Sequence, residues 1–282
     1  MWIKKDSSML ILSAVKAYLQ VRPIGVRNAI RLYISYQVSV LLYLLAPARF
    51  RSVGYLIPGR SKLTVTIGGV HANVRPGTTD LAIFATAHEP RTSSWFQVKP
   101  GDIVVDVGAH IGRYTLMAAR YASKVVAVEP EPSNFSALLS NIRLNSYSNV
   151  TALCVALSDQ NRKLPLHVAA LGNMGSSSLE PESNGQGTDW IRGTVEVQCD
   201  TLDSIVARLN LESIDWLKID VERHEIPVLE GAQETLARAK NVILEVSRGN
   251  EAPCSKLMER AGLDYRSIDV GTRSSNWFLT RK

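Results

Sequence analysis

Apolar and polar residues alternate over residues 62–75, which read KLTVTIGGVHANVR, on either side of the pair Gly68-Gly69. A period of two is typical of a strand with one buried face. A glycine pair between two such runs favours a tight turn, because glycine accepts positive φ at no steric cost. This segment therefore predicts a β-hairpin.

After the hairpin the pattern changes to short apolar runs that alternate with segments of helical spacing. The apolar runs predict strands over residues 102–106, 124–129, 150–157, 214–219 and 241–246. Apolar residues recurring every three or four positions predict helices over residues 112–121, 132–145 and 228–239. Two closing strands are expected over residues 265–270 and 276–280. Strands alternating with helices favour right-handed βαβ units, so we expect an α/β fold with a mostly parallel sheet.

Residues 160–199 interrupt this alternation. They contain five glycines and the run Ser176-Ser177-Ser178. A connection of this length is too long for an ordinary loop, and it is either disordered or functional. We favour a lid or an acceptor-binding loop, because the segment lies where such a sheet binds ligands.

The composition is globular, with 282 residues of which 45% are apolar and 21% are charged. The three cysteines, Cys154, Cys199 and Cys254, are far apart and form no Cys-x-x-Cys pair. This spacing argues against a zinc ribbon, an iron–sulfur cluster and a disulfide framework. A reducing compartment is the simpler interpretation of these cysteines, so we expect a cytoplasmic protein. We expect it to be peripheral on, or anchored to, a membrane only through its first residues.

The positive charge is concentrated at the start of the chain. Residues 1–60 carry nine basic side chains and one acidic side chain, a net charge of +8, whereas the whole chain has a net charge of +6. A nucleic-acid-binding protein would spread its positive charge over a folded binding face, so we expect no nucleic-acid partner. A basic segment rich in apolar residues favours an anionic membrane surface instead. We expect residues 1–60 to form a basic, apolar helical arm and residues 61–282 to form the catalytic domain.

Within the arm, the run from Leu32 to Ala48 contains no charged residue. Its seventeen residues are short for a membrane span, which needs about 20 residues, and three polar side chains dilute it. A helix that packs on the protein or lies in the membrane interface is the preferred interpretation. A true span is a second interpretation, and a cleaved signal peptide is disfavoured because Lys16 interrupts the early apolar stretch.

Carboxylates follow two of the predicted strands. The first strand ends in DVGAHIG, residues 106–112, where Gly108 and Gly112 are four positions apart, so the dinucleotide fingerprint G-x-G-x-x-G is not met. The second strand ends at Glu129, where a carboxylate can accept hydrogen bonds from both hydroxyls of a ribose. An acid at this position also serves NAD in such folds, so Glu129 alone does not choose the cofactor.

A longer series of motifs identifies a family. In order along the chain stand DVGAHIGRYT, VAVEPEPSNF, LLSNIRLN, ALSD, GNMGSSSL, CDTLDS, LKIDVERHEIPVLEGA and VILEV. This series closely resembles the FkbM family of S-adenosylmethionine-dependent methyltransferases over about residues 70–247. The resemblance implies S-adenosylmethionine as the cofactor. It also implies a class I methyltransferase fold, which is Rossmann-like, with a seven-stranded, mostly parallel sheet and helices on both faces.

The resemblance also implies a set of cofactor-binding residues. The residues implied at the methionine end of the cofactor are Asp106, Gly108, Ala109 and Gly112. Glu129 would hold the ribose, while Ser158 and Asp159, which end the motif ALSD, would face the adenine. Asn134 and Phe135 would lie near the ribose and adenine, although both would serve equally well to begin and pack a helix.

The predicted fourth strand ends at Asp220, at an edge where open α/β sheets place their ligands. The family pattern there is D-V-E-G-x-E, whereas this chain has Arg223-His224 in place of the Gly-x pair. This departure leaves the shape of the acceptor pocket open. Pro227 fits only the first turn of a helix, so residues 222–225 are expected to form a loop before that helix.

Transfer of a methyl group to a hydroxyl requires an aligned acceptor and the loss of a proton. The candidate bases are, in order, Asp220, Glu222 and His224, with Glu225 and Glu245 in reserve. No group of histidine, aspartate and glutamate residues has convincing metal-ligand spacing, so we expect no metal.

The favoured function is an O-methyltransferase that acts on a hydroxyl of a small molecule, a glycan, a glycolipid or another lipid-linked acceptor, or a secondary metabolite. The preference for oxygen and the range of substrates come from the resemblance, and the basic, apolar arm favours a lipid-linked acceptor among them. Two alternatives stay open. One is an NAD-dependent oxidoreductase on the same sheet, and the other is a protein that binds S-adenosylmethionine without catalysis.

Overall fold

The structure is a computed structural model, and it describes residues 21–45, 62–76, 78–84, 89–170, 175–180 and 191–281. Contacts divide the chain into two units, Met1–Pro90 with Leu171–Met174, and Arg91–Ala170 with Gly175–Lys282. The expected boundary after residue 60 differs from this division, because the hairpin at residues 62–75 belongs to the first unit.

The first unit contains a three-stranded antiparallel sheet and two described helices. The strands are β1 (Arg22–Pro23), β2 (Leu63–Ile67) and β3 (Val70–Val74), and the helices are α2 (Val26–Leu45) and α3 (Asp80–Phe84). β2 and β3 form the predicted hairpin, and the alternate residues of each strand are buried. Asp80 is buried beside the end of β3, where it accepts two side-chain hydrogen bonds from Arg75 at 2.8 and 2.9 Å.

Helix α2 begins six residues before the uncharged run, and residues 46–48 of that run lie outside the described residues. The side chains of Leu32 and Ser35 are buried, whereas those of Val26, Ile30 and Tyr33 are exposed. None of the helices in the described part of the chain is long and apolar enough to span a bilayer.

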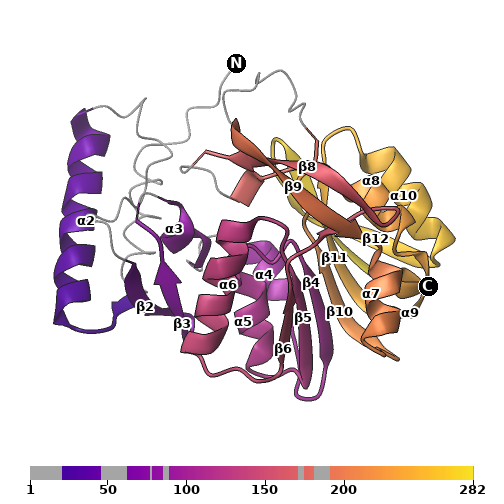
Figure 1. Cartoon of the computed structure of the whole chain (residues 1–282), viewed down its shortest axis with the longest axis horizontal. Coiled ribbons are helices and arrows are strands. Elements are labelled where there is room, and N and C mark those ends of the chain that lie inside the picture. Colours follow the sequence, from indigo (N-terminus) through magenta and orange to yellow (C-terminus); the bar gives the residue numbers. More distant parts are fainter. Residues whose placement is uncertain are drawn as a thin grey trace. The chain divides into compact units, whose positions relative to one another are not determined.

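The second unit is built on a seven-stranded sheet with the order β12-β13-β11-β10-β4-β5-β6 (Figure 1). Its strands are β4 (Ile103–Val107), β5 (Lys124–Val128), β6 (Val150–Leu153), β10 (Ile214–Ile219), β11 (Ala239–Ser247), β12 (Leu263–Val270) and β13 (Ser274–Arg281). β13 is antiparallel to both of its neighbours, and all other pairs are parallel. This sheet confirms the predicted Rossmann-like class I methyltransferase fold.

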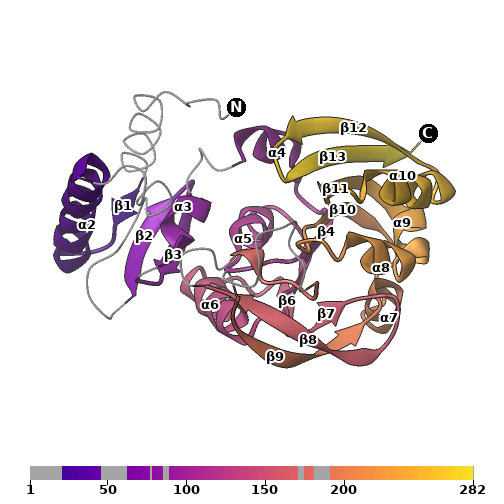
Figure 2. The ribbon, with the colours of Figure 1, turned by 90° about the horizontal axis from the view of Figure 1, so that it is seen from above.

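Helices cover both faces of this sheet (Figures 1 and 2). One face carries α5 (Arg113–Ala119) and α6 (Pro132–Leu144), and the other carries α7 (Leu202–Arg208), α8 (Glu225–Glu230), α9 (Gln233–Arg238) and α10 (Glu251–Arg260). Successive strand residues point to opposite faces. Val105 and Leu217 therefore join the core under α7–α10, whereas Val104 and Trp216 pack with α5 and with aromatic residues that follow α4 (Pro90–Trp95).

Two predicted elements differ from the structure around residue 160. The predicted strand 150–157 is divided, since β6 ends at Leu153 and β7 (Ala156–Leu157) pairs with β9 (Ile191–Asp200) in a separate sheet. β9 also pairs with β8 (Arg162–Ala169), so much of the segment expected to be an irregular loop is a hairpin. The end of β9 does alternate, with Val195, Val197 and Cys199 facing inward, but the glycines and the serine run between the two strands favoured a loop over the whole segment. The role of this segment as a lid or acceptor loop stays a prediction.

Helices differ from the prediction as well, and the short helices α3, α4 and α7 were not predicted. The predicted helix 228–239 consists of α8 and α9, which are separated at Gly231. A Cβ atom at Gly231 would lie 2.1 Å from the carbonyl oxygen of Ser158, so the backbone approaches another segment too closely for any side chain. α10 was not predicted, because only three of its residues are buried and its sequence is largely polar.

Gly108 offers a test of how tightly two strand ends are joined. Its φ is +78°, and a Cβ atom there would lie 1.7 Å from the carbonyl oxygen of Asp220. We expect Gly108→Ala to lower the free energy of unfolding by about 2–4 kcal/mol, because overpacking and a left-handed backbone both oppose it. Chemical denaturation measures this loss. Gly193→Ala is the control, since no atom lies within 4 Å of a Cβ atom there. Equal losses in the two variants would contradict the close contact.

Candidate functional site

Four carboxylates meet at the edge where the parallel strands end. Asp106 stands in β4, Glu129 follows β5, Asp220 follows β10, and Glu245 lies near the end of β11. β4 pairs directly with both β5 and β10, and the main-chain N–H of Asp220 donates to the carbonyl oxygen of Val107 at 3.0 Å. The sequence argument required Asp106 and Glu129 to be neighbours, and the structure places them on adjacent strands.

Asp106 is a buried carboxylate with one oxygen in use. Its Oδ2 accepts a hydrogen bond of 2.6 Å from the hydroxyl of Thr115, while its side chain is 1% exposed. Within the described residues, Oδ1 has no hydrogen-bond partner. Burial raises the pKa of Asp106, and the positive charge of Lys218 opposes that rise. A buried acceptor of this kind fits a ligand that donates a hydrogen bond.

Glu129 is held by main-chain amides on both sides. Its Oε2 accepts from the N–H of His110 at 2.8 Å, and its Oε1 accepts from the N–H of Glu131 at 3.0 Å. Burial raises the pKa of Glu129 to about 7, although these hydrogen bonds favour the charged form. The carboxylate is therefore fixed in place, and each oxygen keeps lone pairs for a ribose hydroxyl.

The glycine bend after β4 follows the course that the sequence indicated. The N–H groups of Gly108 and Ala109 both donate to the carbonyl oxygen of Val128, at 2.9 and 3.0 Å. Gly112 has a φ of +101° and stands directly before α5. These contacts bring the bend against the end of β5, beside Glu129.

The residues expected near the adenine and ribose serve structural roles as well. Asn134 lies in the first turn of α6, where its N–H donates to the carboxylate of Glu131 at 2.7 Å. Its side-chain amide is 3.5 Å from Glu129 Oε1. Sequence reasoning missed Glu131 as the residue that caps α6, although an acid directly before a helix that begins with proline is a recognisable signal.

Lys218 is the second residue that sequence reasoning missed. Its ammonium group lies 2.9 Å from Oδ2 of Asp220 and 4.7 Å above the ring of Tyr114, and it is almost fully buried. It also stands directly beside Asp106 in the sheet. The available signal was a lysine inside the otherwise apolar end of a buried strand, since charged side chains are rarely buried without a partner.

The remaining acids have unequal environments. Burial raises the pKa of Glu222 to about 8, and the negative charges of Asp220 and Glu225 add to the rise. The pKa of Glu245 is raised mainly by the charge of Asp220, with burial adding to it, and the hydroxyl of Ser274 donates to it. Glu225 is fully buried, and it accepts hydrogen bonds from Ser247 at 2.5 Å and from Asn250 at 2.6 Å. Glu225 therefore holds the loop together.

His224 has both ring nitrogens engaged. Nε2 lies 3.1 Å from the hydroxyl of Ser158, and Nδ1 lies 2.8 Å from a carboxylate oxygen of Glu180. Ser158 is fully buried, and the neighbouring Asp159 pairs with Arg162 at 2.9 Å. This geometry disfavours His224 as a base, because neither nitrogen is left to take a proton from an acceptor.

Where the chain departs from the family pattern, the backbone adopts positive φ angles. Glu222 and Arg223 have φ values of +44° and +82°. The second of these positions is where the family pattern has glycine, the residue that adopts positive φ readily. Asn250 donates to the carbonyl oxygen of Arg223 at 3.2 Å, and the N–H of Arg223 donates to Glu225 at 3.0 Å. The loop therefore keeps the shape expected of glycine because its surroundings hold it.

A model of the family described as "Methyltransferase FkbM domain" matches residues 106–262. The chain belongs to the FkbM methyltransferase family. Family membership confirms the resemblance seen in the sequence and supports S-adenosylmethionine as the cofactor. The matched region includes every predicted site residue, from Asp106 to Glu245.

Three curated relatives illustrate the family. The chain is 25% identical over 159 residues to the 2-O-methyltransferase NoeI of Sinorhizobium fredii. This match covers 53% of this chain and 65% of that protein. It is 31% identical over 191 residues to the methyltransferase sdnD of Sordaria araneosa, covering 57% and 73%. It is 27% identical over 173 residues to the hexuronic acid methyltransferase AglP of Haloferax volcanii, covering 59% and 65%. In two of the three, the match spans slightly less than two thirds of the relative.

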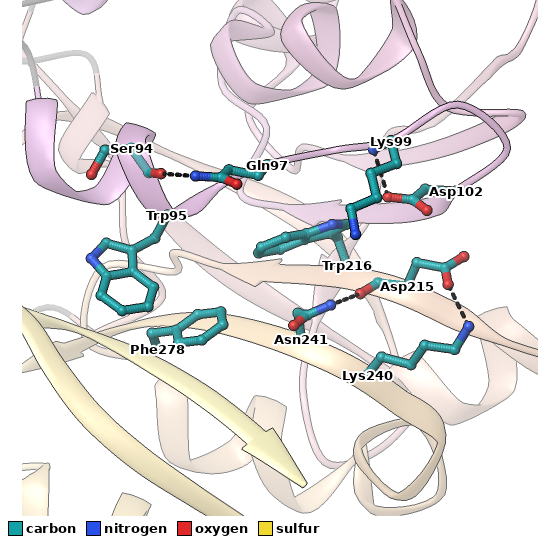
Figure 3. Close-up of a pocket in the computed structure, with 10 residues that line it drawn as sticks. All are labelled: Ser94, Trp95, Gln97, Lys99, Asp102, Asp215, Trp216, Lys240, Asn241 and Phe278. Carbon is teal, nitrogen blue, oxygen red and sulfur yellow. Dashed lines mark hydrogen bonds and ion pairs between the residues drawn. The ribbon is translucent and has the colours of Figure 1, made fainter.

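A separate pocket of about 620 Å³ lies at the opposite ends of the strands (Figure 3). Trp95, Trp216 and Phe278 supply its aromatic part, and Lys240 pairs with Asp215 at 2.7 Å on its polar side. Asp215 and Trp216 begin β10, whereas the candidate site lies where that strand ends. This pocket is therefore not part of the candidate site.

The raised pKa of Glu129 predicts a pH dependence of stability. Between its ordinary pKa of 4.5 and about 7, the folded state keeps a proton that the unfolded state has released. The free energy of unfolding should therefore fall as the pH rises through this range, by about 3 kcal/mol for this group. Glu129→Gln removes the titration, so the stability difference between wild type and variant should change with pH and level off above about pH 7.

Chemical denaturation at several pH values from 4.5 to 8 measures this difference. Glu196→Gln is the control, because Glu196 is exposed in a surface pair with Lys163. A difference for Glu129→Gln that is as flat as that of the control would show that burial does not raise the pKa.

Proposed function

We propose that this protein is an S-adenosylmethionine-dependent O-methyltransferase that moves a methyl group to a hydroxyl of a glycan, a glycolipid or a secondary metabolite. The observation that carries the proposal is the pair of strand-end carboxylates, Asp106 and Glu129, on either side of the glycine bend in a chain of the FkbM family. The NAD-dependent alternative is disfavoured, because it requires a different glycine loop and a different family.

The residues at this edge fit the cofactor. Glu129 is fixed by two amides and would accept the ribose hydroxyls, and the buried Oδ1 of Asp106 would accept a hydrogen bond from the methionine end. Ser158 and Asp159 would face the adenine. When bound, S-adenosylmethionine supplies an electrophilic methyl group on a positively charged sulfur. The chain's own contribution is to fix these polar groups in advance and to exclude water from Asp106.

Glu222 is the base that we favour, ahead of Asp220. A base works best when its pKa is close to the working pH, and burial raises that of Glu222 to about 8. Asp220 is engaged by Lys218 at 2.9 Å, so its role is to balance charge beside Glu222. In this proposal Glu222 accepts the proton that the acceptor hydroxyl loses.

The class of acceptor rests on the relatives. One is named a 2-O-methyltransferase and another a hexuronic acid methyltransferase, which supports a sugar hydroxyl as the acceptor. The absence of a nucleic-acid partner stays a prediction. Cofactor binding without catalysis also stays an alternative, and only an assay of methyl transfer distinguishes it from enzymatic activity.

Calorimetric titration with S-adenosylmethionine tests the cofactor site. We expect Glu129→Gln and Asp106→Asn to weaken binding by about 10- to 100-fold, because each loses a hydrogen bond to a charged group. Asp102→Asn is the matched control, since Asp102 precedes the other end of β4 and accepts from the N–H of Lys99. Unchanged binding in both site variants, or tighter binding of NAD than of S-adenosylmethionine, would reject the assignment.

The same protein, given isotopically labelled cofactor and free or lipid-linked glycans, separates catalysis from binding. Label should appear on a hydroxyl of the acceptor with wild type, and Glu222→Gln should lower the rate by at least about 100-fold. An equal rate in Glu222→Gln would remove Glu222 from the role of base.

We also propose that the arm, residues 1–60, attaches the protein to an anionic membrane surface. The arm has a net charge of +8, and α2 contains no acidic residue. Exposed apolar side chains recur along α2 every three or four positions, at Val26, Ile30, Tyr33, Ile34, Val38 and Leu41. A basic helix with such a stripe suits the headgroup region of a bilayer, where its apolar side chains enter and its arginines meet phosphate groups. A lipid-linked acceptor would then be close to the enzyme.

Sedimentation with vesicles tests the attachment. We expect the triple variant Ile30→Ser, Ile34→Ser and Leu41→Ser to bind vesicles containing phosphatidylglycerol at least about tenfold less than wild type. Val270→Ser is the control, since Val270 is exposed on β12 in the second unit. Added salt should weaken wild-type binding by screening exposed charges. Equal sedimentation of wild type and triple variant would reject the membrane role.

A further inference from the structure

His224 joins three segments that are far apart in the sequence. It stands directly before α8 and is 5% exposed. Nε2 contacts Ser158, 66 residues earlier, at 3.1 Å, and Nδ1 contacts Glu180, 44 residues earlier, at 2.8 Å. The imidazole therefore lies between the turn that we expect to face the adenine and the segment 175–180.

The segment 175–180 is attached to the loop that carries Glu222. The hydroxyl of Ser178 donates to the main-chain carbonyl oxygen of Glu222 at 2.5 Å, and the side chain of Ser176 hydrogen-bonds the Glu222 carboxylate. On its other side, Ser178 exchanges two main-chain hydrogen bonds with His167 of β8, at 2.8 and 3.1 Å. The position of this segment therefore affects the position of Glu222.

The proton arrangement of His224 follows from its partners. An ionised carboxylate can only accept, so Glu180 requires the hydrogen on Nδ1. The hydroxyl of Ser158 donates its single hydrogen to Oδ1 of Asp159 at 2.9 Å, so it accepts from the N–H at Nε2. The partners of the two ring nitrogens fix this arrangement. It makes His224 a relay of two directed hydrogen bonds, with no free site for proton transfer.

The turn at Ser158 is itself held firmly. The N–H of Ser158 donates to the carbonyl oxygen of Asp200 at 3.0 Å, and its own carbonyl oxygen lies against Gly231. Its neighbour Asp159 carries the pair with Arg162. A ligand that contacts this turn would therefore act on a rigid element, and His224 is the buried connection from that element to Glu180.

We propose that His224 is a positioning residue that couples cofactor binding at the turn Ser158-Asp159 to the order of the segment 175–180, and through it to the placement of Glu222. This inference rests on the proposed function. The family pattern has Gly-x where this chain has Arg223-His224, so the coupling belongs to this chain and is not implied by the pattern.

Hydrogen exchange measured with and without S-adenosylmethionine tests the coupling. In wild type the cofactor should slow exchange at residues 106–112, which form part of its site, and by about tenfold at residues 175–180. In His224→Phe the effect at 175–180 should fall below about twofold, while that at 106–112 persists. His167→Phe is the matched control, because only the main chain of His167 contacts Ser178. It should behave as wild type.

Glu180 supplies a second pair of variants that does not disturb a buried residue, since its side chain is 43% exposed. Glu180→Gln keeps an oxygen that accepts from Nδ1 and should retain the effect at 175–180, whereas Glu180→Ala should lose it. A purely structural role would leave the cofactor effect equal in the two variants. The coupling would be overturned by equal effects of the cofactor on exchange in Glu180→Ala and Glu180→Gln, or by no effect at residues 175–180 in wild type. In either case, protection at residues 106–112 would still support the proposed function. Absence of protection at both places would overturn both.

Discussion

The candidate site depends on the buried positive charge of Lys218. Lys218 lies beside Asp106 in the sheet and 2.9 Å from Asp220, and its charge opposes the effect of burial on both Asp106 and Glu222. Parallel strands that end at one edge bring their acids together whether or not the charges repel. Without a counter-ion, several neighbouring buried carboxylates would be costly to ionise. Lys218 therefore makes this concentration of acids compatible with a folded protein.

The positive charge of Lys218 does not act equally on all the acids, and their electrostatic environments therefore differ. Asp220 is in direct contact with Lys218, whereas the pKa values of Glu222 and Glu245 are raised by burial and by the charge of Asp220. Glu129 lies on the neighbouring strand and is fixed by amides, which suits a carboxylate that binds a ligand.

The fold and the positions of the candidate acids at the strand ends were largely predictable because they depend on local pattern. Buried strands gave unbroken apolar runs, and Asp106, Glu129 and Asp220 stand where those runs end. The hairpin of β8 and β9 was missed although part of β9 alternates, because the glycines and the serine run between the strands are typical of a loop.

The contacts of His224 could not be read from the sequence either, because they join residues 44 and 66 positions apart. Lys218 had a visible signal in its apolar strand, but its partner was evident only when the strand ends were placed. Sequence pattern therefore located the acids, and only the structure showed which of them share a counter-ion and which positions are held by distant side chains.

Arg223 has a consequence for the unfolded chain. Its φ of +82° costs the folded state about 1–2 kcal/mol relative to glycine. Arginine also visits fewer backbone conformations than glycine when the chain is unfolded, which returns about 0.4–1 kcal/mol. The net penalty of departing from the family pattern is therefore smaller than the backbone angle alone implies. A loop whose shape is imposed by its neighbours can therefore change its residue type at moderate thermodynamic cost.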